Sequence, residues 1–433
     1  TSKAYTILQA GCGVTGRFSS INTLGLQGTS PFYGGALTYT GTEVLLTVEA
    51  DFSLAGLTGN EGQVVTQLSS LTDPTSSQLQ MLNALLGLNV TETDIALSQM
   101  AGEPHVVDLL QTEYRNRQFL RKLSAPLYNQ MMHRDELGGN KKPTAPGLSF
   151  WSKGSAFFNS DAWSDLSVGR SMQPNDGDAY GYNSAGYSVT LGTQKEVRPE
   201  VTVGGAAAYD YDLNRYHVGG SGTMNTVNAG LYGLYRPEQY YVFADLAVSY
   251  THSKLNRPIN LDTLAYSADS TAKITQAALY VETARDLTLK TSLPILIQPF
   301  VGFELGSYWQ PTLTETGAGD LDLIFENQHQ NRMNTRMGTH MSFQSTIHPN
   351  TRLDVDLAWQ YRWAGYNDTM TAQFSTFGSE FTTIGLPRYR STFDGAVRMV
   401  KTLNKAWNVS GEVASDTRMS STRAKVGVTM RLN

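Results

Sequence analysis

Histidine, serine and acidic side chains are the groups from which a hydrolytic or metal site could be built in this chain. The seven histidines are spread over its whole length, and no pair has the spacing that places two metal ligands on one face. No Gly-x-Ser-x-Gly turn presents a nucleophile between a strand and a helix. The single cysteine, Cys12, excludes a disulfide framework and a cysteine-based zinc site. The residues therefore predict no catalytic group, no metal site and no cofactor.

Charged side chains follow another pattern, a regular alternation with apolar ones. In residues 352–363 the odd positions are apolar and the even positions are nearly all polar, beginning with Arg352 and Asp354. Because the side chains of a strand point alternately to opposite faces, this segment has one apolar and one charged face. We expect the charged faces of such strands to line the interior of a closed barrel. The charged residues assigned to this interior are Asp245, Glu282, Glu304, Arg336, Arg352, Arg362, Asp394, Glu412 and Lys425.

The composition excludes several classes of protein. Charged residues make up 16% of the 433 residues, below the roughly 25% of soluble domains, and there are 22 tyrosines and 40 glycines. No run approaches about 18 apolar residues, which excludes a helical membrane protein. A net charge of −5 without a basic cluster argues against nucleic acid as a partner. These properties leave an outer-membrane β-barrel, with lipid and lipopolysaccharide as its surroundings.

About twelve alternating segments follow one another from residue 148 to the end of the chain. Short links such as 236–239 alternate with long ones, as periplasmic turns and outer loops do in a membrane barrel. A soluble antiparallel sandwich also alternates, but tyrosine and tryptophan at the segment ends favour a membrane interface. The expected strands are 148–158, 184–196, 199–212, 222–236, 240–254, 271–286, 294–309, 331–347, 351–364, 388–402, 405–417 and 421–433. The expected long loops are 159–183, 213–221, 255–270, 310–330 and 365–387.

Two regions precede the predicted barrel domain, which is 148–433. Residues 1–56 contain short apolar strands joined by Gly-rich turns, and we expect them to be either the last rungs of a parallel β-helix or a small β-domain. The β-helix is preferred, because it explains a sequence that starts in the middle of a pattern. The chain opens at Thr1 without a signal peptide, so we expect it to be the C-terminal part of a longer protein.

Residues 57–147 form a predicted helical linker, in which 105–125 is the longest helix. This helix lies between Pro104 and Pro126, and at 1.5 Å per residue it spans about 32 Å, close to the thickness of a bilayer core. Its charges prevent contact with lipid, so it is either an exposed surface helix or, as we prefer, a helix inside the pore. Its C-terminal half carries the basic residues Arg115, Arg117, Arg121 and Lys122. We expect at least two of the arginines to pair with carboxylates of the barrel wall, with Glu304 and Glu282 as first choices.

Several motifs of the chain resemble the autotransporter family, the type V secretion proteins. Residues 13–18 and 37–47 are similar to the end of a pertactin-like passenger, and 96–105 (Ala-Leu-Ser-Gln-Met-Ala-Gly-Glu-Pro-His) is similar to the linker of the family. The start of the barrel resembles the family in Phe150-Trp151, Asp176-Gly-Asp178, Tyr187-Ser-Val-Thr-Leu-Gly192 and Val201-Thr-Val-Gly-Gly205. The resemblance implies a twelve-stranded barrel that holds the linker helix in its pore.

The function implied by this resemblance is that of an outer-membrane translocation unit of a Gram-negative bacterium, which exports its own passenger to the cell surface. The implied partners are the barrel assembly machinery and periplasmic chaperones, and the implied oligomeric state is a monomer. A porin-like channel or a barrel hydrolase is the alternative, and any enzymatic activity is expected upstream. Self-cleavage is not implied, because self-cleaving members have two adjacent asparagines where this helix has Asn116 alone. The end of the chain, Met430-Arg-Leu-Asn433, departs from the usual terminal aromatic residue.

Overall fold

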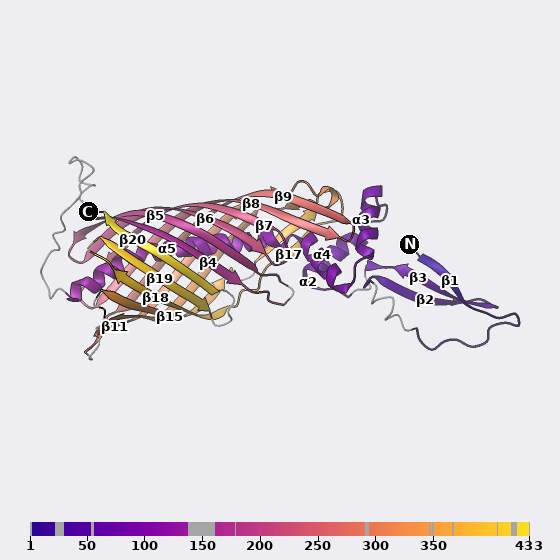
Figure 1. Ribbon diagram of the computed structural model, residues 1–433, viewed down its shortest axis with the longest axis horizontal. Helices are drawn as coiled ribbons and strands as arrows, with labels where there is room; N and C mark the ends of the chain where they lie inside the picture. The colour runs from indigo at the N-terminus through magenta and orange to yellow at the C-terminus, as the bar shows by residue number, and fades with distance from the viewer. Residues whose placement is uncertain are drawn as a thin grey trace.

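A closed antiparallel barrel makes up most of the computed structural model (Figure 1). The structure describes residues 2–21, 30–52, 56–136, 161–177, 179–290, 294–345, 348, 350–365, 368–404, 406–416 and 422–432. Within these residues twelve strands form a ring, which closes where β20 pairs with β4 and where β9 pairs with β11. The ring strands are β4 (Asp161–Gln173), β5 (Tyr182–Arg198), β6 (Val201–Tyr216), β7 (Ser221–Tyr235), β8 (Tyr240–Leu261), β9 (Leu264–Arg285), β11 (Pro294–Gln310), β14 (Gln328–Gln344), β15 (Thr351–Ala364), β18 (Ser391–Thr402), β19 (Trp407–Asp416) and β20 (Thr422–Leu432). A short strand, β10 (Leu287–Lys290), adds to one end of β11.

Alternation along each strand separates an apolar exterior from a polar interior. On β8, Tyr241 and Asp245 point inward and are buried, whereas Leu246 and Val248 point outward and are half exposed. The same two-residue period places Ser249 and Thr251 inside. An apolar exterior with a polar interior is the arrangement of a barrel that spans a membrane. The predicted closed barrel of about twelve strands is confirmed.

The two ends of the barrel differ in their connections. At one end, here called the turn end, consecutive strands are joined by tight turns such as 199–200 and 236–239. At the other, the loop end, the connections include 174–181, 311–327 and 365–390.

Several predicted loops are wrong. Residues 159–183 contain β4, in which few apolar side chains alternate with Asp165 and Ser167, so the apolar signal is weak. Residues 255–270 continue β8 and β9 around a two-residue turn at Asp262, whose φ of 47° is left-handed. Residues 213–221 contain the end of β6, and the predicted strand 148–158 lies outside the described residues.

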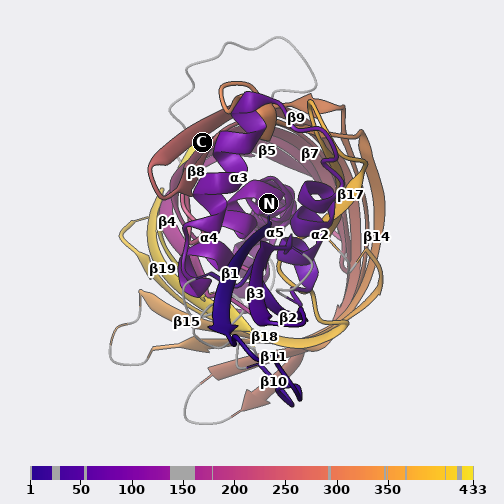
Figure 2. The same ribbon diagram turned by 90° about the vertical axis from the view of Figure 1, so that its right-hand side faces the viewer.

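The remaining long connections fold into a second, smaller sheet at the loop end. It consists of β12 (Leu313–Thr314), β13 (Leu323–Phe325), β16 (Thr369–Phe374) and β17 (Phe381–Ile384), with a 3-10 turn at Gly319–Leu321. Helices α2 (Gly59–Ser69), α3 (Ser76–Leu86) and α4 (Val90–Ala101) pack against this sheet and bury a common apolar core. We call these helices and the small sheet the cap. Figure 2 shows the helices of the cap in front of the barrel mouth.

Local sequence explains where the helices of the cap begin and end. Thr75 and Asn89 each accept the backbone N–H three residues further on, and Gln78 and Glu92 reciprocate, which makes two capping boxes. Gly102 ends α4 with a φ of 74°, and a Cβ there would lie 2.6 Å from Leu323 Cδ1. Only glycine combines this left-handed conformation with so close an approach to β13.

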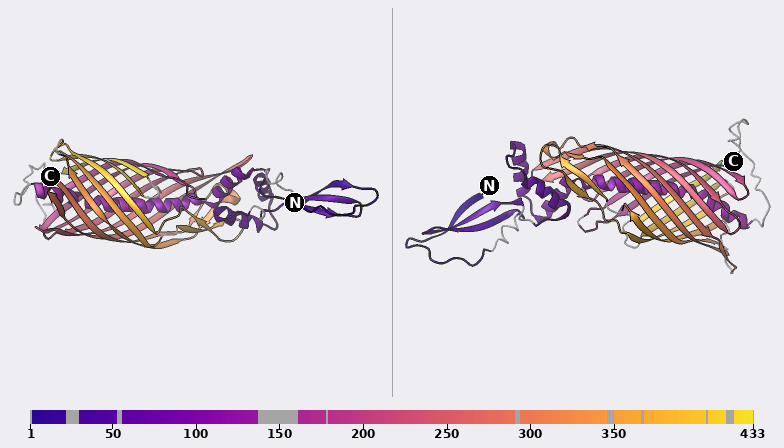
Figure 3. Two further views of the ribbon diagram at one scale, coloured as in Figure 1. Left: turned by 90° about the horizontal axis from the view of Figure 1, so that it is seen from below. Right: turned by 180° about the vertical axis from the view of Figure 1, so that it is seen from behind.

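Helix α5 (Glu103–Glu136) starts directly after this glycine and runs along the interior of the barrel toward the turn end (Figures 1 and 3). Its 34 residues correspond to about 51 Å, longer than the predicted helix 105–125. Pro104 lies in its first turn, where the missing N–H costs nothing. The expectation that Pro126 ends the helix is wrong, since the helix continues for ten more residues. No helix among the described residues has the length and apolar character needed to cross a bilayer.

The N-terminal residues form a separate three-stranded sheet of β1 (Ser2–Gln9), β2 (Tyr33–Tyr39) and β3 (Glu43–Ala50). Both β1 and β2 pair with β3 in antiparallel fashion. The predicted parallel β-helix rungs are therefore wrong for the described residues. The reason is the short link at Thr40–Thr42, which can join antiparallel neighbours but is too short for a parallel crossover.

Candidate functional site: the barrel interior around α5

Four basic residues of α5 pair with carboxylates on four different strands. Arg115 forms an ion pair with Asp212 of β6. Arg117 Nε lies 2.9 Å from Glu304 Oε1 of β11, and Arg121 Nη2 lies 3.4 Å from Asp394 Oδ2 of β18. On the remaining side, Lys122 Nζ lies 3.1 Å from Asp165 Oδ1 of β4. Ion pairs with strands on different sides of the barrel thus hold the helix in place.

The other preferred partner, Glu282, does not contact an arginine of α5. Its carboxylate lies 3.3 Å from His340 Nε2 and accepts the hydroxyl of Tyr241 at 2.7 Å. His340 Nδ1 in turn lies 3.1 Å from Asp356. Expecting Glu282 to bind the helix is therefore wrong, because its oxygens already contact Tyr241 of the adjacent β8 and His340 of β14.

A second charge cluster, which the sequence reasoning missed, lies nearer the loop end. Glu113 of α5 forms ion pairs with Arg332 of β14 and with Arg388, and it also contacts Arg117 at 3.2 Å. Asp368 contacts both Arg332 and Arg388. The only sequence signal for this cluster is the i,i+4 spacing of Glu113 and Arg117, because two of its members are in long connections.

Hydrogen bonds complete the contacts between α5 and the wall. Asn116 Nδ2 donates to Ser249 Oγ at 2.5 Å, and Lys122 Nζ donates to Ser188 Oγ at 2.6 Å. Asp108 accepts the hydroxyl groups of Tyr216 and Ser253. These buried polar groups face one another between α5 and the wall, so withdrawing the helix would leave them without these partners.

Apolar contacts fix the middle of α5 against one side of the barrel. Phe119 and Leu123 are buried and pack on a cluster that includes Phe243 and Phe300. A Cβ at Gly230 of β7 would lie 2.9 Å from Leu123 Cδ1. The wall is therefore shaped to receive this face of the helix.

The remaining predicted interior residues lie on the wall and are paired mainly with each other. Arg336 Nη2 contacts Asp394 at 2.6 Å and Asp356 at 3.3 Å, so Asp394 serves both the wall and Arg121. Arg352 Nε lies 2.7 Å from Asp354, and Arg362 donates to the carbonyl of Tyr389 at 2.5 Å. The structure also places Asp245 inside the wall, buried opposite Tyr280, and Glu412 directly across from Lys425.

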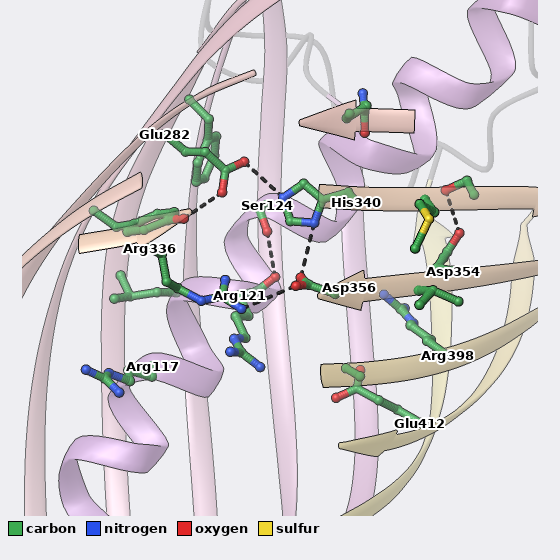
Figure 4. Close-up of a pocket in the computed structure, with 18 of the residues that line it drawn as sticks. Arg117, Arg121, Ser124, Glu282, Arg336, His340, Asp354, Asp356, Arg398 and Glu412 are labelled. Carbon is green, nitrogen blue, oxygen red and sulfur yellow. Dashed lines mark hydrogen bonds and ion pairs between the residues drawn. The ribbon is translucent and has the colours of Figure 1, made fainter. Parts of the chain in front are cut away.

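A cavity of about 190 Å³ remains between α5 and the wall near the turn end. Figure 4 shows Arg117 and Arg121 of α5 on one side and Asp356, Arg398 and Glu412 on the other. Positive and negative side chains alternate around this space, as they do in the rest of the interior. The cavity is therefore one part of the lumen that the helix leaves unfilled, and a second of about 150 Å³ lies between α5 and the wall near Tyr182 and Asp394.

At the loop end, a fully buried ion pair joins the barrel to the cap. Arg257 of β8 and Glu315 of the loop after β12 have no exposed side-chain surface, and Arg257 Nε lies 2.9 Å from Glu315 Oε1. His105 Nε2 lies 2.8 Å from the same oxygen. Arg257 also donates to the carbonyls of Gln99 and Leu321. One guanidinium thus connects β8, the end of α4 and the loop before β13.

Burial alone would raise the pKa of Glu315, but the positive charge of Arg257 and the bond to His105 outweigh it and lower the pKa to about 2. Glu315 is therefore ionised at all pH values that the outer surface meets, and the clamp formed by Arg257, Glu315 and His105 is a permanently charged one. We refer to these three residues as the cap clamp. Among the described residues, no group of three His, Cys, Asp or Glu side chains could hold a metal ion.

A closed twelve-stranded barrel with an apolar exterior, whose interior is occupied by a helix continuous with an external segment, defines the class of outer-membrane translocators. A family model described as the autotransporter β-domain matches residues 162–414. The chain belongs to this family.

Comparison with known proteins gives three further likenesses. The extracellular serine protease of Serratia marcescens is 24% identical over 429 residues, which is 91% of this chain and 39% of that protein, so the chain spans about two fifths of its relative. The translocator domain of the autotransporter NalP from Neisseria meningitidis has a TM-score of 0.48 at 11% identity, covering 71% of this chain and 97% of that one. The transport unit of AIDA-I from Escherichia coli has a TM-score of 0.40 at 12% identity, covering 65% and 94%.

The chain is the outer-membrane translocation unit of an autotransporter from a Gram-negative bacterium, and the passenger is exported to the cell surface. Because outer-membrane barrels have short periplasmic turns and longer outer loops, the loop end faces outward and the turn end faces the periplasm. The N-terminal sheet and the cap lie beyond the loop end (Figure 1). The barrel is a transporter and not a catalytic domain.

Proposed function

We propose that the structure represents the translocator after export, with α5 retained as the plug of the pore. The contacts of α5 with β4, β6, β11 and β18 carry this proposal, because a helix paired on all sides cannot share the lumen with a second polypeptide. A helix with its side chains is about 10–12 Å across, close to the free width of a twelve-stranded barrel. Export therefore precedes the docking of α5.

The cap provides a second closure outside the pore. Its core buries Leu68, Met81 and Leu97 of the linker helices against Phe325 and Phe374 of the small sheet. These residues can meet only after the linker has left the pore, since the sheet is built from the outer loops. The free energy of forming this apolar core then opposes backward movement of the exported chain.

The partners and the passenger belong to the same proposal. We assign outer-membrane lipid and lipopolysaccharide to the apolar exterior, and the barrel assembly machinery and periplasmic chaperones to insertion of the chain as a monomer. Any enzymatic activity of the whole protein, such as the one named for the Serratia marcescens relative, is assigned to sequence upstream of residue 1. The histidines support this, since His105 and His340 each bind a carboxylate.

The single cysteine allows the direction of export to be tested without any substitution. Cys12 is exposed and lies in the turn after β1. We expect a membrane-impermeant maleimide to label Cys12 on intact cells as completely as on lysed cells, because the N-terminal sheet is outside. The fraction labelled is read from the mass of the purified chain.

Two controls make this result decisive. A Cys12→Ser variant should remain unlabelled, and a Cys12→Ser, Asn350→Cys variant, with its thiol in a turn at the periplasmic end, should react only after lysis. Labelling of Cys12 that requires lysis would show that the N-terminal sheet stays in the periplasm. That result would contradict the proposal.

A further inference from the structure

Three basic side chains lie on the outside of the barrel near the loop end. They are Arg215 of β6, Lys254 of β8 and Lys273 of β9, and all three are exposed. Their neighbours Asn214 and Ser253 are buried and point into the lumen, so by alternation the three cations point outward. We call these three residues the outer basic cluster.

Strand pairing brings the cluster together. Lys254 is paired with Thr223 of β7 on one side and Thr271 of β9 on the other, and Lys273 stands two residues from Thr271. Arg215 is paired with Ser221 of β7. With neighbouring strands about 4.8 Å apart, Lys254 lies one strand spacing from Lys273 and two from Arg215, whereas Arg215 and Lys273 are three spacings apart, about 14 Å across the sheet. The long side chains of Arg215 and Lys273 can therefore reach a headgroup with two phosphates from either side of Lys254.

The cluster differs from the cations of the lumen in its lack of a counterion. Arg115, Arg117, Arg121 and Lys122 of α5 each pair with an interior carboxylate, but in the part of the chain that the structure describes none of the cluster residues forms an ion pair. The acid closest in register is Asp269, which accepts a hydrogen bond from Asn256 at 2.8 Å. Three positive charges thus face the surroundings of the barrel.

The height of the cluster in the membrane follows from the aromatic residues next to it. Tyr250 on β8 and Trp309 on β11 point outward and are 46% and 42% exposed. Such residues mark the boundary between hydrocarbon and headgroups. Lys254 lies four residues beyond Tyr250 toward the loop end, and Lys273 lies two residues beyond Thr275, the pairing partner of Trp309. The cations therefore begin where the headgroup layer of the outer leaflet begins.

The opposite half of the exterior has no such cations. At the loop ends of β14, β15 and β18, the outward positions that the structure describes carry Asn331, Trp363 and Phe393 without a lysine or arginine. A general requirement for membrane anchoring would distribute cations around the whole circumference. Arg170 of β4 is also exposed and points outward near the loop end, so the outward strand cations that the structure describes at this end lie on β4, β6, β8 and β9, on one side of the barrel.

We propose that the outer basic cluster binds the phosphate groups of a phosphorylated glycolipid headgroup in the outer leaflet. Phosphate is the anion at this depth of the membrane, and Arg and Lys both recognise it, the former with two parallel donors. Binding at the outer basic cluster gives a location to the lipid contact of the proposed function, and it does not depend on α5 being the plug of the pore. Tyr250 and Val248 below the cluster would lie against the acyl chains.

The test uses the purified full chain in detergent and bisphosphorylated lipid A as the probe, with bound lipid counted by native mass spectrometry. Replacing the cluster by Arg215→Gln, Lys254→Gln and Lys273→Gln should weaken lipid A binding at least tenfold, since three attractions to the phosphates are removed. The matched control is Arg198→Gln, Arg285→Gln and Lys401→Gln, which removes three exposed cations at the turn end. This control should keep the affinity of the parent.

Three further measurements separate the outcomes. Dephosphorylated lipid A should bind to the parent no more tightly than lipid A binds to the triple variant. A Lys254→Arg, Lys273→Arg variant should keep the affinity of the parent for lipid A. Inorganic phosphate at the same phosphorus concentration should not displace lipid A. Equal binding of the dephosphorylated lipid, equal loss in the control variant or full displacement by inorganic phosphate would each overturn the assignment. Labelling of Cys12 on intact cells reports on export separately.

Discussion

A chain that begins after Glu136, and therefore lacks α5 and everything before it, is expected to conduct ions several-fold better than the full chain in planar bilayers. In the full chain α5 fills the lumen and leaves a cavity of about 190 Å³ beside it. Removing a rod about 10–12 Å wide from a twelve-stranded barrel opens a continuous aqueous path. Single-channel conductance measures this directly.

The control for this experiment is deletion of residues 1–58, which removes the N-terminal sheet and keeps the cap and α5. This chain should show the low conductance of the parent. An intermediate state is expected for Arg115→Gln, Arg117→Gln and Arg121→Gln together, with a current that fluctuates between closed and open levels. These substitutions leave Asp212, Glu304 and Asp394 without their partners on the helix. If the chain that begins after Glu136 has the same conductance as the parent, α5 lies outside the conducting path.

The second large effect is expected at the cap clamp. Replacing Arg257 by Met leaves Glu315 buried without its main counterion, and breaking a buried pair on one side typically costs about 3–5 kcal/mol. Because the pair lies between the cap and the barrel, its loss lowers the free energy needed to open the cap locally. Cleavage of residues 59–101 by an added protease should become at least a hundredfold faster.

The pKa of Glu315 also predicts how the rate of cap cleavage changes at low pH. Its folded pKa of about 2 lies below its ordinary value of 4.5. A lowered pKa contributes stability that is fully present above pH 4.5 and is lost as the pH falls through the folded pKa. The rate at which an acid-active protease cleaves the parent should be constant down to about pH 4.5 and should rise below it. Over this range the free energy needed to open the cap should fall by a total of roughly 3 kcal/mol.

Two variants serve as controls for the cap clamp. Arg285→Met, on the exterior at the turn end, removes an exposed arginine and should leave the cleavage rate unchanged. Glu315→Gln should lose the rise below pH 4.5. A cleavage rate in Arg257→Met that equals that of the parent would mean that the cap is held without the buried pair.

The barrel could be predicted from the sequence because alternation is a local property of each strand. Residues 352–363 alternate so regularly that strand, face and interior side follow from the residue types alone. The same reasoning failed for β4, where Leu166 and Val168 alternate with small and polar residues and the apolar signal is short. Beyond Leu255, polar residues such as Asn256 suggested a loop, although the strand continues against the cap.

The contacts of α5 could be predicted only in kind. The charges of Arg115, Arg117 and Arg121 exclude a lipid environment, and a narrow polar pore then requires acidic partners. Which carboxylates these are depends on strand register and on the rotation of the helix, and neither is contained in the residue pattern. Glu304 does pair with Arg117, whereas the carboxylate of Glu282 contacts His340 of β14.

Long-range pairs between connections could not be predicted at all. Glu113 with Arg388, and Glu315 with Arg257, join residues that are hundreds of positions or several strands apart in the chain. The parallel rungs expected for residues 1–56 failed for a related reason. Apolar strands separated by Gly turns fit either arrangement, and only the length of the link at Thr40–Thr42 distinguishes them.

The most direct test of α5 as the plug is a disulfide between the helix and the wall. Asn116 Nδ2 and Ser249 Oγ lie 2.5 Å apart, and Val248, the neighbour of Ser249, points outward to the lipid. In a Cys12→Ser background, Asn116→Cys with Ser249→Cys should cross-link almost completely on mild oxidation in intact outer membranes, whereas Asn116→Cys with Val248→Cys should not cross-link. Absence of the first cross-link, or equal cross-linking of both pairs, would contradict a helix docked inside the pore.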